Sequence, residues 1–373
     1  LNIIYISNSI IPSRTANSIH VMKMCQAFAD NGHEVLLLAP DYKEQNEKGI
    51  NDVFDFYGVR NSFKIKKIFT PKIKGRSIIY TIGILIYLSF NKADLVYGRF
   101  VNGCYLSSLL GFNTIFESHS PIWERSTLEV KLFSKLIEGK NFNKLVVISQ
   151  ALKNIYLKYG YLNEKRIQVA HDGADEVNDF NIKAELNGNE NNLKIGYVGH
   201  LYQGKGMEVI EEIADKVPID VDFHIIGGLI KDIDYWKSKI TSKNVYFYGF
   251  VSQKEVSSYI NSLDICILPN QKIVKTYNDG KKEGSNIGDF TSPLKMFEYM
   301  AHKKPIIASN LEVLKEVLNS DTSILVDSEN GNEWIEAIER LKDKKIRTKM
   351  SKNSFNEFKK YTWKNRVNAI INS

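Results

Sequence analysis

A short segment late in the chain combines residue types that could hold a phosphorylated sugar. Ser292-Pro293 is typical of a helix start, and Glu298 lies about one and a half turns further along the predicted helix. A helix N-terminus offers N–H groups and the positive end of a dipole, which suit a phosphate. A carboxylate further in can accept hydrogen bonds from sugar hydroxyls. Phosphate and sugar recognised in this order would fit a nucleotide-sugar.

A glycine-rich turn in the middle of the chain could supply a cation for the same phosphate. The segment GHLYQGKG, residues 199–206, follows a predicted strand, and its glycines allow a tight strand-to-helix turn. Lys205 lies within this turn and could neutralise a diphosphate. A polar segment at 270–290 is predicted to form a loop that closes over the bound donor.

Polar side chains also follow two predicted strands in the first half of the chain. Glu117 and His119 come directly after the run at 114–116, and Arg99 follows the run at 95–97. The carboxyl ends of parallel strands meet at one edge of a sheet, where ligands bind. A histidine there can bind a sugar hydroxyl or move a proton, and an arginine can bind an anionic acceptor.

Short apolar runs alternate with helical patterns in two series, separated by a polar, Asn-rich segment at 176–193. The alternation predicts an α/β protein with parallel sheets and crossover helices. We therefore expect two Rossmann-like domains that face each other across a cleft, with the linker at the polar segment. The predicted strands are residues 3–6, 35–39, 95–97, 114–116 and 145–148 in the first series, and 194–198, 222–226, 245–247, 264–268, 304–308 and 323–326 in the second.

Three segments resemble the retaining glycosyltransferases of family 4, which have the two-domain GT-B fold. The segment FTSPLKMFEYMAHKKPIIAS is similar to the donor-site helix and strand of that family. IGYVGHLYQGKGMEVI is similar to the first unit of its donor domain, and LNIIYISNSIIPSRTANSIHVMKMCQAFADNGHEVLLLAP to its opening strand, loop, helix and strand. The resemblance implies an acceptor-binding domain at 1–180, a donor-binding domain at 190–353, and a terminal helix at 354–373 that packs back on the first domain.

The resemblance also implies roles for individual residues. Lys205 would neutralise the leaving diphosphate, and Glu298 matches the second of two family acids, which binds the nucleotide ribose. Phe290 stands where the first acid is expected, so Asp289 beside it is the candidate to hold the donor sugar. The expected site residues are Lys205, His119, Glu298 and Asp289 for catalysis, Gly199, His200, Gly204, Ser292, Pro293, Leu294 and Lys295 for the donor, and Arg14, Asn17, Ser18, Arg99 and Glu117 for the acceptor.

The resemblance predicts a retaining glycosyltransferase that moves a sugar from a nucleotide-diphosphate sugar to a hydroxyl of a glycan or lipid-linked acceptor. It implies a place in bacterial cell-surface polysaccharide synthesis, and it implies that neither a metal nor a cofactor is needed. Two alternatives stay open: another nucleotide-sugar enzyme of the GT-B fold, such as an epimerase, and a non-catalytic subunit of a glycosyltransferase complex. The second gains support from Phe290 and from His200, which stands near a frequent family arginine.

The charge distribution suggests a membrane partner. The net charge is +7, and a cluster of cations directly precedes an apolar run at 78–90. Such a cluster beside an apolar helix fits an anionic membrane surface, and a solvated loop explains it equally well. The run is too short to span a bilayer and predicts a buried helix. The clustered cations are Lys64, Lys66, Lys67, Lys72, Lys74 and Arg76.

The remaining composition bears on compartment and partners. The 3 cysteines are far apart in apolar contexts, which predicts reduced core residues of a cytoplasmic protein. The first residues given predict a strand and not a signal peptide. We therefore expect a location in the cytoplasm or on the inner face of the cell membrane. Nucleic acid is not an expected partner, because the sequence contains no recognised binding module and no aromatic-basic repeat.

Overall fold

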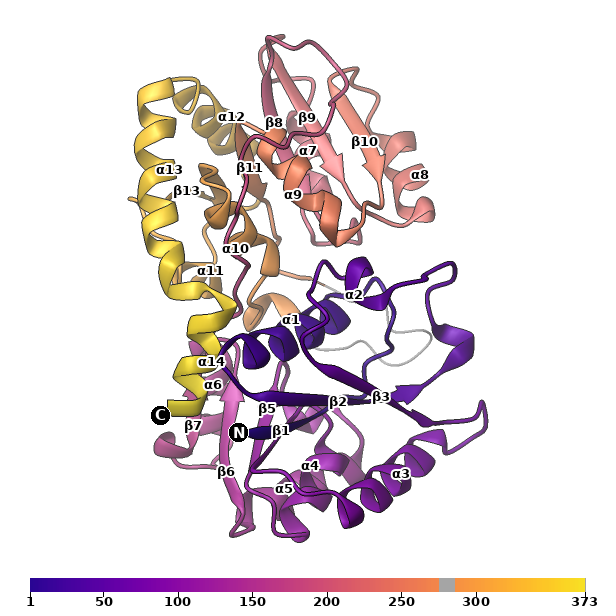
Figure 1. Ribbon diagram of the computed structural model, residues 1–373. Helices are drawn as coiled ribbons and strands as arrows, with labels where there is room; N and C mark the ends of the chain where they lie inside the picture. Colours follow the sequence, from indigo (N-terminus) through magenta and orange to yellow (C-terminus); the bar gives the residue numbers. More distant parts are fainter. Residues whose placement is uncertain (275–285, 373) are drawn as a thin grey trace. The chain divides into compact units, whose positions relative to one another are not determined.

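The computed structural model describes residues 1–274 and 286–372, and the chain divides into two compact units. The first unit comprises Leu1–His171 together with Trp363–Ser373, and the second comprises Asp172–Thr362. Each unit is built on its own parallel sheet (Figure 1). The chain therefore leaves the first unit once and returns to it in its last residues.

The first unit contains a seven-stranded parallel sheet in the order β3-β2-β1-β4-β5-β6-β7. Its central strands are continuous apolar runs, as expected where helices cover both faces of a parallel sheet. The strand order reverses beside β1, which creates the kind of switch point where such sheets bind ligands. The strands are β1 (Asn2–Ile6), β2 (Glu34–Asp41), β3 (Lys64–Phe69), β4 (Leu95–Gly98), β5 (Thr114–Ser118), β6 (Phe142–Val147) and β7 (Ile167–Val169).

Helices cover both faces of this sheet (Figure 1). The last helix of the chain packs against the first, and the side-chain amide of Asn31 donates a 3.2 Å hydrogen bond to the carbonyl oxygen of Lys364. This contact attaches the C-terminus to the first unit. The helices are α1 (Ala16–Asp30), α2 (Val53–Phe56), α3 (Arg76–Phe90), α4 (Val101–Leu109), α5 (Thr127–Glu138), α6 (Gln150–Lys158) and α14 (Trp363–Asn372).

The second unit contains a six-stranded parallel sheet in the order β10-β9-β8-β11-β12-β13. Its core joins fully buried strand residues such as Phe223 and Ile265 to the indole of Trp334. The strands are β8 (Leu193–Val198), β9 (Val221–Ile226), β10 (Val245–Gly249), β11 (Ile265–Leu268), β12 (Ile306–Ser309) and β13 (Ser323–Val326). The helices are α7 (Met207–Ile213), α8 (Ile230–Lys239), α9 (Gln253–Ser262), α10 (Leu294–Ala301), α11 (Glu312–Lys315), α12 (Gly331–Arg340) and α13 (Lys344–Phe358).

The predicted α/β class with two Rossmann-like sheets is confirmed, and every predicted run overlaps a strand. The sequence did not predict β3 and β7. β3, with the sequence KIKKIF, mixes lysines with apolar residues instead of forming an apolar run, because it is an edge strand with one open side. The polar segment at 176–193 belongs to the second unit, and the expected single helix over 354–373 is divided into the end of α13 and α14.

The apolar run at 78–90 differs from its prediction as a buried helix. It forms most of α3, whose buried residues are Tyr80, Ile84 and Leu88. The opposite side of the helix carries large apolar side chains that are exposed, namely Ile78, Ile82, Ile86 and Phe90. Within the described residues, no helix combines the length and the apolar character that crossing a bilayer requires.

Candidate active site

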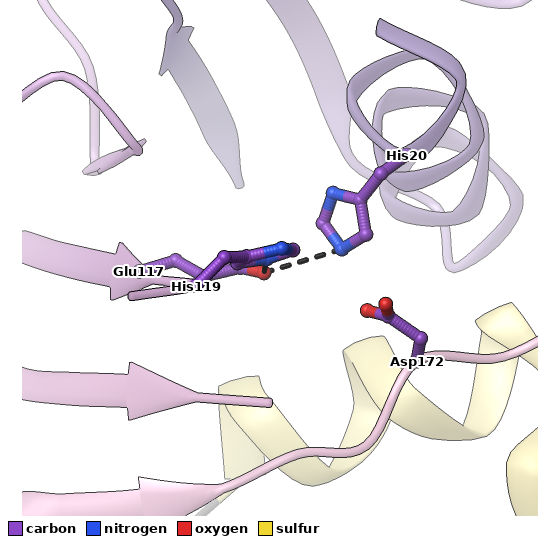
Figure 2. Close-up of side chains that lie close together, drawn as sticks. All are labelled: His20, Glu117, His119 and Asp172. Carbon is purple, nitrogen blue, oxygen red and sulfur yellow. Dashed lines mark hydrogen bonds and ion pairs between the residues drawn. The ribbon is translucent and has the colours of Figure 1, made fainter. Parts of the chain in front are cut away.

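The first unit holds a buried charged cluster at the carboxyl ends of β4 and β5. These strands are parallel neighbours, so Tyr97 in β4 and Glu117 in β5 lie at the same edge of the sheet. Glu117 is fully buried and accepts a hydrogen bond from the Tyr97 hydroxyl. His119 follows β5, and His20 reaches the same carboxylate from α1 (Figure 2). Asp172, also drawn in Figure 2, opens the second unit.

One oxygen of the Glu117 carboxylate has three nitrogen partners. Nε2 of His119 lies 2.5 Å from Oε1, and Nε2 of His20 lies 3.2 Å from it. Nη2 of Arg366, from α14, donates to the same oxygen over 2.9 Å. With the tyrosine on the other oxygen, the carboxylate is surrounded by donors from β4, α1, α14 and the chain that follows β5.

These contacts assign the tautomers of both histidines. An ionised carboxylate can only accept, so Nε2 of His119, which forms a hydrogen bond with it, must carry a proton. Arg99 assigns His20, because its Nη1 lies 3.3 Å from Nδ1 of His20 and a guanidinium can only donate, which leaves the ring proton of a neutral His20 on Nε2. The cluster therefore leaves Nδ1 of His119 unprotonated, as a hydrogen-bond acceptor.

The charges in the cluster fix the protonation states of its members. Burial by itself would raise the pKa of Glu117. The positive charge of Arg366, the nearby His20 and the hydrogen bond from His119 outweigh this effect and hold that pKa well below its ordinary value. Burial lowers the pKa of His119 to about 3, and the charge of Arg99 adds to this effect. At neutral pH, Glu117 is a carboxylate and His119 is a neutral imidazole.

Two imidazoles and a carboxylate are also metal ligands in other proteins. In this cluster, however, Arg366 pairs with the carboxylate and also donates to the carbonyl oxygens of His171 and Ala170. A second guanidinium, that of Arg99, lies against His20. Two fixed cations oppose the binding of a third, so the cluster is better suited to orient imidazoles than to hold a metal ion.

The second unit brings the glycine-rich turn after β8 against the first turn of α10. The hydroxyl of Tyr299 accepts a 2.8 Å hydrogen bond from the N–H of Val198, which joins the helix to the end of β8. One turn earlier, Nζ of Lys295 lies 3.6 Å from the centre of the Tyr197 ring. A Cβ atom at Gly199 would lie 3.6 Å from the same Nζ. Two segments that are far apart in sequence therefore form one site.

Backbone packing positions Lys205 within this turn. Gly204 and Gly206 have φ angles of +84° and +100°, and a Cβ at either would come within 2.2 Å of a carbonyl oxygen. Glu208 accepts hydrogen bonds from the N–H groups of both glycines, at 3.0 and 3.2 Å. Since Glu208 occupies these N–H groups, an anion bound here would depend on the Lys205 side chain and not on the amides of the turn.

The two lysines of this site hold their protons weakly. Burial lowers the pKa of Lys205 to about 8. Burial also lowers the pKa of Lys295 well below its ordinary value, and the positive charge of Lys205 lowers it further. A bound phosphate would offset both the burial and the repulsion, so the pair is well suited to an anion.

The start of α10 adds to the same site. The helix begins at Leu294, and its first turn leaves the N–H groups of Leu294 and Lys295 without intrahelical partners. These groups and the helix dipole favour a negative charge. Glu298 lies three residues after Lys295, on the same side of the helix. The site can therefore bind a diphosphate through two lysines and two amides, and a hydroxyl group through a carboxylate.

Two sequence-family models match the chain, one in each half. The model described as Glycosyltransferase Family 4 matches residues 18–177, and the model described as Glycosyl transferases group 1 matches residues 192–344. The chain belongs to the family 4 glycosyltransferases.

Individual relatives are distant. The glycosyltransferase is 22% identical over 287 residues to an uncharacterized 41.2 kDa protein in the cps region of Klebsiella pneumoniae, across 69% of this chain and 71% of that one. It is 26% identical over 252 residues to an uncharacterized glycosyltransferase of Methanocaldococcus jannaschii, across 64% of this chain and 59% of that one, less than two thirds of its length. The structure of Anabaena HepE in complex with UDP matches with a TM-score of 0.72 and 13% identity, across 100% of this chain and 99% of HepE. This likeness confirms the GT-B fold.

The structure of the glycosyltransferase brings together part of the expected donor set. Gly199 lies beside Nζ of Lys295 at the turn after β8, and Gly204 shapes the part of that turn that carries Lys205. His200 belongs to the same turn, with its ring centre 5.9 Å from that of Tyr202. These residues therefore form one cationic site in the second unit.

The predicted cap of α10 is wrong. Pro293 is the N-cap residue, and it has no N–H group with which to bind a phosphate. The hydroxyl of Ser292 instead accepts a 3.0 Å hydrogen bond from the N–H of Asp172. Ser292 therefore forms a hydrogen bond with the first residue of the second unit. The backbone amides that can bind an anion begin at Leu294.

The position of the missing family acid lies in the core. Phe290 is 3% exposed, and an unpaired carboxylate there would be costly to bury. Asp289 beside it is exposed, and its Oδ1 accepts a 2.9 Å hydrogen bond from the side-chain amide of Asn286. Residues 275–285 of the predicted closing loop lie outside the described residues. The role of Asp289 stays a prediction.

The loop after β1 carries Arg14, Asn17 and Ser18, which were expected to bind the acceptor. Thr15 is the N-cap of α1, and its side chain accepts a hydrogen bond from the N–H of Ser18. Ser18 is buried and donates its hydroxyl to loop carbonyl oxygens, whereas Asn17 is exposed. Arg14 pairs with Glu47 over 2.6 Å. The loop therefore satisfies much of its polarity internally, which is not visible from its sequence.

Arg99 and Glu117, also expected to bind the acceptor, lie in the buried cluster of the first unit. Their contacts are to imidazoles, so the structure gives them the geometry of groups that orient His20 and His119. His20, Tyr97 and Arg366 were not predicted. His20 could have been found, because it is an ionisable residue within the apolar pattern of α1. Arg366 could not, because nothing local in the sequence pairs it with Glu117, 249 positions earlier.

Proposed function

We propose that this glycosyltransferase transfers a hexose from a nucleotide-diphosphate sugar to a hydroxyl of a glycan or lipid-linked acceptor, with retention of anomeric configuration. The second unit binds the donor nucleotide, and the first unit supplies groups that contact the reacting sugars. Neither a metal nor a further cofactor takes part. Retention and the hexose rest on the family, and the absence of a metal requirement rests on the cations at the donor site.

The observation that most supports this proposal is that Lys295, in the first turn of α10, lies against the glycine-rich turn that carries Lys205. Both ammonium groups are partly withdrawn from water and repel each other, which costs free energy in the free protein. A bound anion would offset this cost. Lys295 also supplies a second cation at a site where His200 replaces a frequent family arginine. A diphosphate is the anion that matches two cations and two helix amides.

This arrangement provides electrostatic catalysis. Breaking the bond between the sugar and the diphosphate places negative charge on the departing phosphate, and preorganised cations lower the free energy of that state. Glu298, one turn beyond the amides, accepts hydrogen bonds from the nucleotide ribose. Because the ribose is bound by Glu298, the diphosphate of the same nucleotide is positioned beside Lys205.

In the first unit, His119 acts as a hydrogen-bond acceptor and not as a general base. Nδ1 of His119 is unprotonated in the assigned tautomer and can accept a bond from a sugar hydroxyl. With a pKa of about 3, the imidazole is too weak a base to remove a hydroxyl proton. The departing phosphate is the stronger base and takes the proton of the attacking hydroxyl on the same face of the sugar.

The relatives suggest where to begin the search for substrates. HepE has been solved with UDP-glucose as well as with UDP, and one relative lies in a cps region. We therefore propose a UDP-sugar as the donor and bacterial cell-surface polysaccharide synthesis as the setting. The reaction takes place in the cytoplasm, at the inner face of the membrane where a lipid-linked acceptor is available.

A thermal-shift panel of UDP, GDP, dTDP and their hexose derivatives tests the proposal. A ligand that binds the native state raises the melting temperature. At a ligand concentration of 100 times Kd, the free energy of unfolding increases by about 2.7 kcal/mol. The matching sugar nucleotide should then be consumed with a glycan acceptor, and NMR of the product should show the anomeric configuration of the donor. An inverted product, or no stabilisation by any nucleotide, contradicts the proposal.

Burial of Phe290 favours a second candidate, a non-catalytic GT-B subunit. Such a subunit would gain stability from a nucleotide but release no nucleotide diphosphate from a sugar nucleotide, with or without acceptor. An epimerase would instead convert the sugar nucleotide to its epimer without any acceptor. The same panel, followed by chromatography of the nucleotides, separates the three functions.

Glu298→Gln should weaken donor binding without unfolding the protein. The change keeps the shape of the side chain but removes its charge, and a hydrogen bond to a charged group contributes about 1.5–3 kcal/mol. We expect KM for the donor to rise roughly 10-fold to 10²-fold, with a melting temperature near that of wild type. Glu336→Gln, at an exposed position of α12, is the matched control. Unchanged donor affinity in Glu298→Gln would remove the carboxylate from the site.

Nucleotide affinity should fall as pH rises through about 8. The pKa of Lys205 is about 8 in the free protein, and a bound diphosphate raises it, so binding above that pH takes up a proton. Calorimetry at pH 8.5 in buffers of different ionisation enthalpy measures this uptake. In Lys205→Arg, whose guanidinium stays charged, we expect binding with less uptake and a flatter pH dependence. Equal uptake in wild type and Lys205→Arg would assign the titration to another group.

A further inference from the structure

An edge strand and a helix of the first unit are packed into one element. A Cβ at Gly83 of α3 would lie 2.3 Å from Cγ2 of Ile68 in β3, so the helix rests directly on the strand. Nζ of Lys66 lies 4.9 Å from the centre of the Tyr87 ring. Figure 1 shows this pair at one margin of the first unit, with α4 next to α3. Charged residues of β3 and apolar residues of α3 are therefore held side by side.

The outer side of α3 is an apolar ridge. Ile78, Ile82 and Ile86 are 61%, 49% and 57% exposed, and they recur every four residues on one side of the helix. Phe90 continues the row at 85%, whereas the opposite side of α3 is buried against the unit. The segment that leads into the helix adds Phe69 and Ile73, at 70% and 55%. A contiguous ridge of this kind usually marks a surface that meets a partner or a lipid bilayer.

The excess positive charge of the chain is concentrated around this ridge. Residues 56–93 contain eight Lys or Arg residues and no Asp or Glu, whereas the whole chain has a net charge of +7. All other residues together therefore have a net charge of −1. Of the cations, Lys64, Lys66, Lys72 and Lys74 are exposed on β3 and on the turn into α3. Arg76 is engaged instead with Glu44 and the ring of Tyr42.

We infer that the β3–α3 element is a membrane-docking surface for anionic lipids. The apolar ridge of Ile78, Ile82, Ile86 and Phe90 enters the boundary between headgroups and acyl chains, and the flanking lysines contact lipid phosphates. An amphipathic helix with cations at its border binds membranes in this way. A second copy of the chain is a poorer occupant, because a symmetric contact would press two of these cationic segments together.

This inference deepens the proposed function and rests on it for its purpose, which is to bring the enzyme to a lipid-linked acceptor. The surface itself is separate from the two clusters described above, since its residues belong to neither. The enzyme can therefore transfer sugar to a short water-soluble acceptor even if it does not bind membranes. Equally, it can bind membranes even if it does not transfer sugar.

Vesicle sedimentation with the full chain tests the surface. Wild type should bind vesicles that contain 30% phosphatidylglycerol and should bind neutral phosphatidylcholine vesicles far more weakly. Replacing Lys64, Lys72 and Lys74 by Gln should lower the partition coefficient on the order of 10²-fold at low salt, with a smaller effect at high salt. Replacing Ile78, Ile82 and Ile86 by Ser should lower it by a similar factor at every salt concentration.

Matched controls change residues of the same kinds that are exposed elsewhere on the chain. Leu128, Ile219 and Ile230 are 57%, 99% and 80% exposed, and their triple Ser variant should bind vesicles like wild type. The same is expected when Lys231, Lys237 and Lys239 of α8 become Gln. A tryptophan in place of Phe90 should shift its emission to the blue on binding and be quenched by brominated acyl chains.

Three results would overturn the inference. Vesicle binding that is absent, or indifferent to lipid charge, removes the docking surface. Binding that the lysine variant abolishes and the isoleucine variant leaves intact indicates a patch for a soluble polyanion. A wild-type dimer that the isoleucine variant converts to a monomer identifies the ridge as a contact between copies. Donor hydrolysis and transfer to a soluble acceptor, measured in the same variants, report on the proposed function independently.

Discussion

Lys205→Ala should lower turnover of the sugar nucleotide by roughly 10²-fold or more, the effect of losing one preorganised electrostatic donor. The turn amides cannot compensate, because Glu208 already occupies the N–H groups of Gly204 and Gly206. Lys295→Ala should cause a loss of similar kind, and the double variant should lose less than the product of the two, since both lysines act on one diphosphate. The measurement is kcat for release of the nucleotide diphosphate at saturating donor.

Three variants make this result interpretable. Lys205→Arg keeps a cation in the turn and should retain more activity than Lys205→Ala. Lys237→Ala, at an exposed position of α8, should behave like wild type. Removing either half-buried lysine also relieves a repulsion, so Lys205→Ala and Lys295→Ala should melt at or above the wild-type temperature. A turnover close to wild type in Lys205→Ala, with unchanged nucleotide affinity, would show that the lysine only shapes the turn.

The sequence predicted most of the fold because its strands are buried on both faces. Strands such as β4 and β11 are short apolar runs bounded by polar segments, and that pattern is legible without any structure. β3 escaped prediction because an edge strand needs no apolar run, so KIKKIF resembles a charged loop. The exposure of one side of α3 was not predicted either. Apolar residues on all sides of a helix normally indicate burial, so the whole helix was expected to be buried.

The candidate site was predictable where it depends on backbone geometry. Glycines, a lysine between them and a helix start are local signals, and they pointed to two segments, those of Lys205 and Lys295, that the fold brings together. The cluster in the first unit depends instead on side chains from four elements that meet in the fold. The carboxylate of Glu117 and the imidazole of His119 were found at the end of one strand, but their tautomers and charge states follow from His20 and Arg366, which the sequence does not connect.

Arg366→Ala should destabilise the first unit by about 3–5 kcal/mol, because it leaves a buried carboxylate without its guanidinium partner. Arg366 and Glu117 side chains are 2% and 0% exposed, so water cannot replace the lost contact. In wild type, the depressed pKa of Glu117 contributes stability that is present above its ordinary value of 4.5 and is lost as pH falls below it. The difference in stability between wild type and Arg366→Ala should therefore shrink in acid, as measured by urea unfolding at pH 7 and pH 4.

A positioning role for Arg366 predicts more than lost stability. The double variant Glu117→Gln with Arg366→Met removes both charges and should recover much of the stability, as replacement of a buried ion pair by neutral groups often does. It should nevertheless stay poorly active, because a glutamine both donates and accepts and no longer fixes the Nε2–H tautomer of His119. Nitrogen-15 NMR of the histidine rings reads the tautomer directly. If the double variant regains stability and full activity with the tautomer unchanged, the pair formed by Arg366 and Glu117 serves only to attach α14.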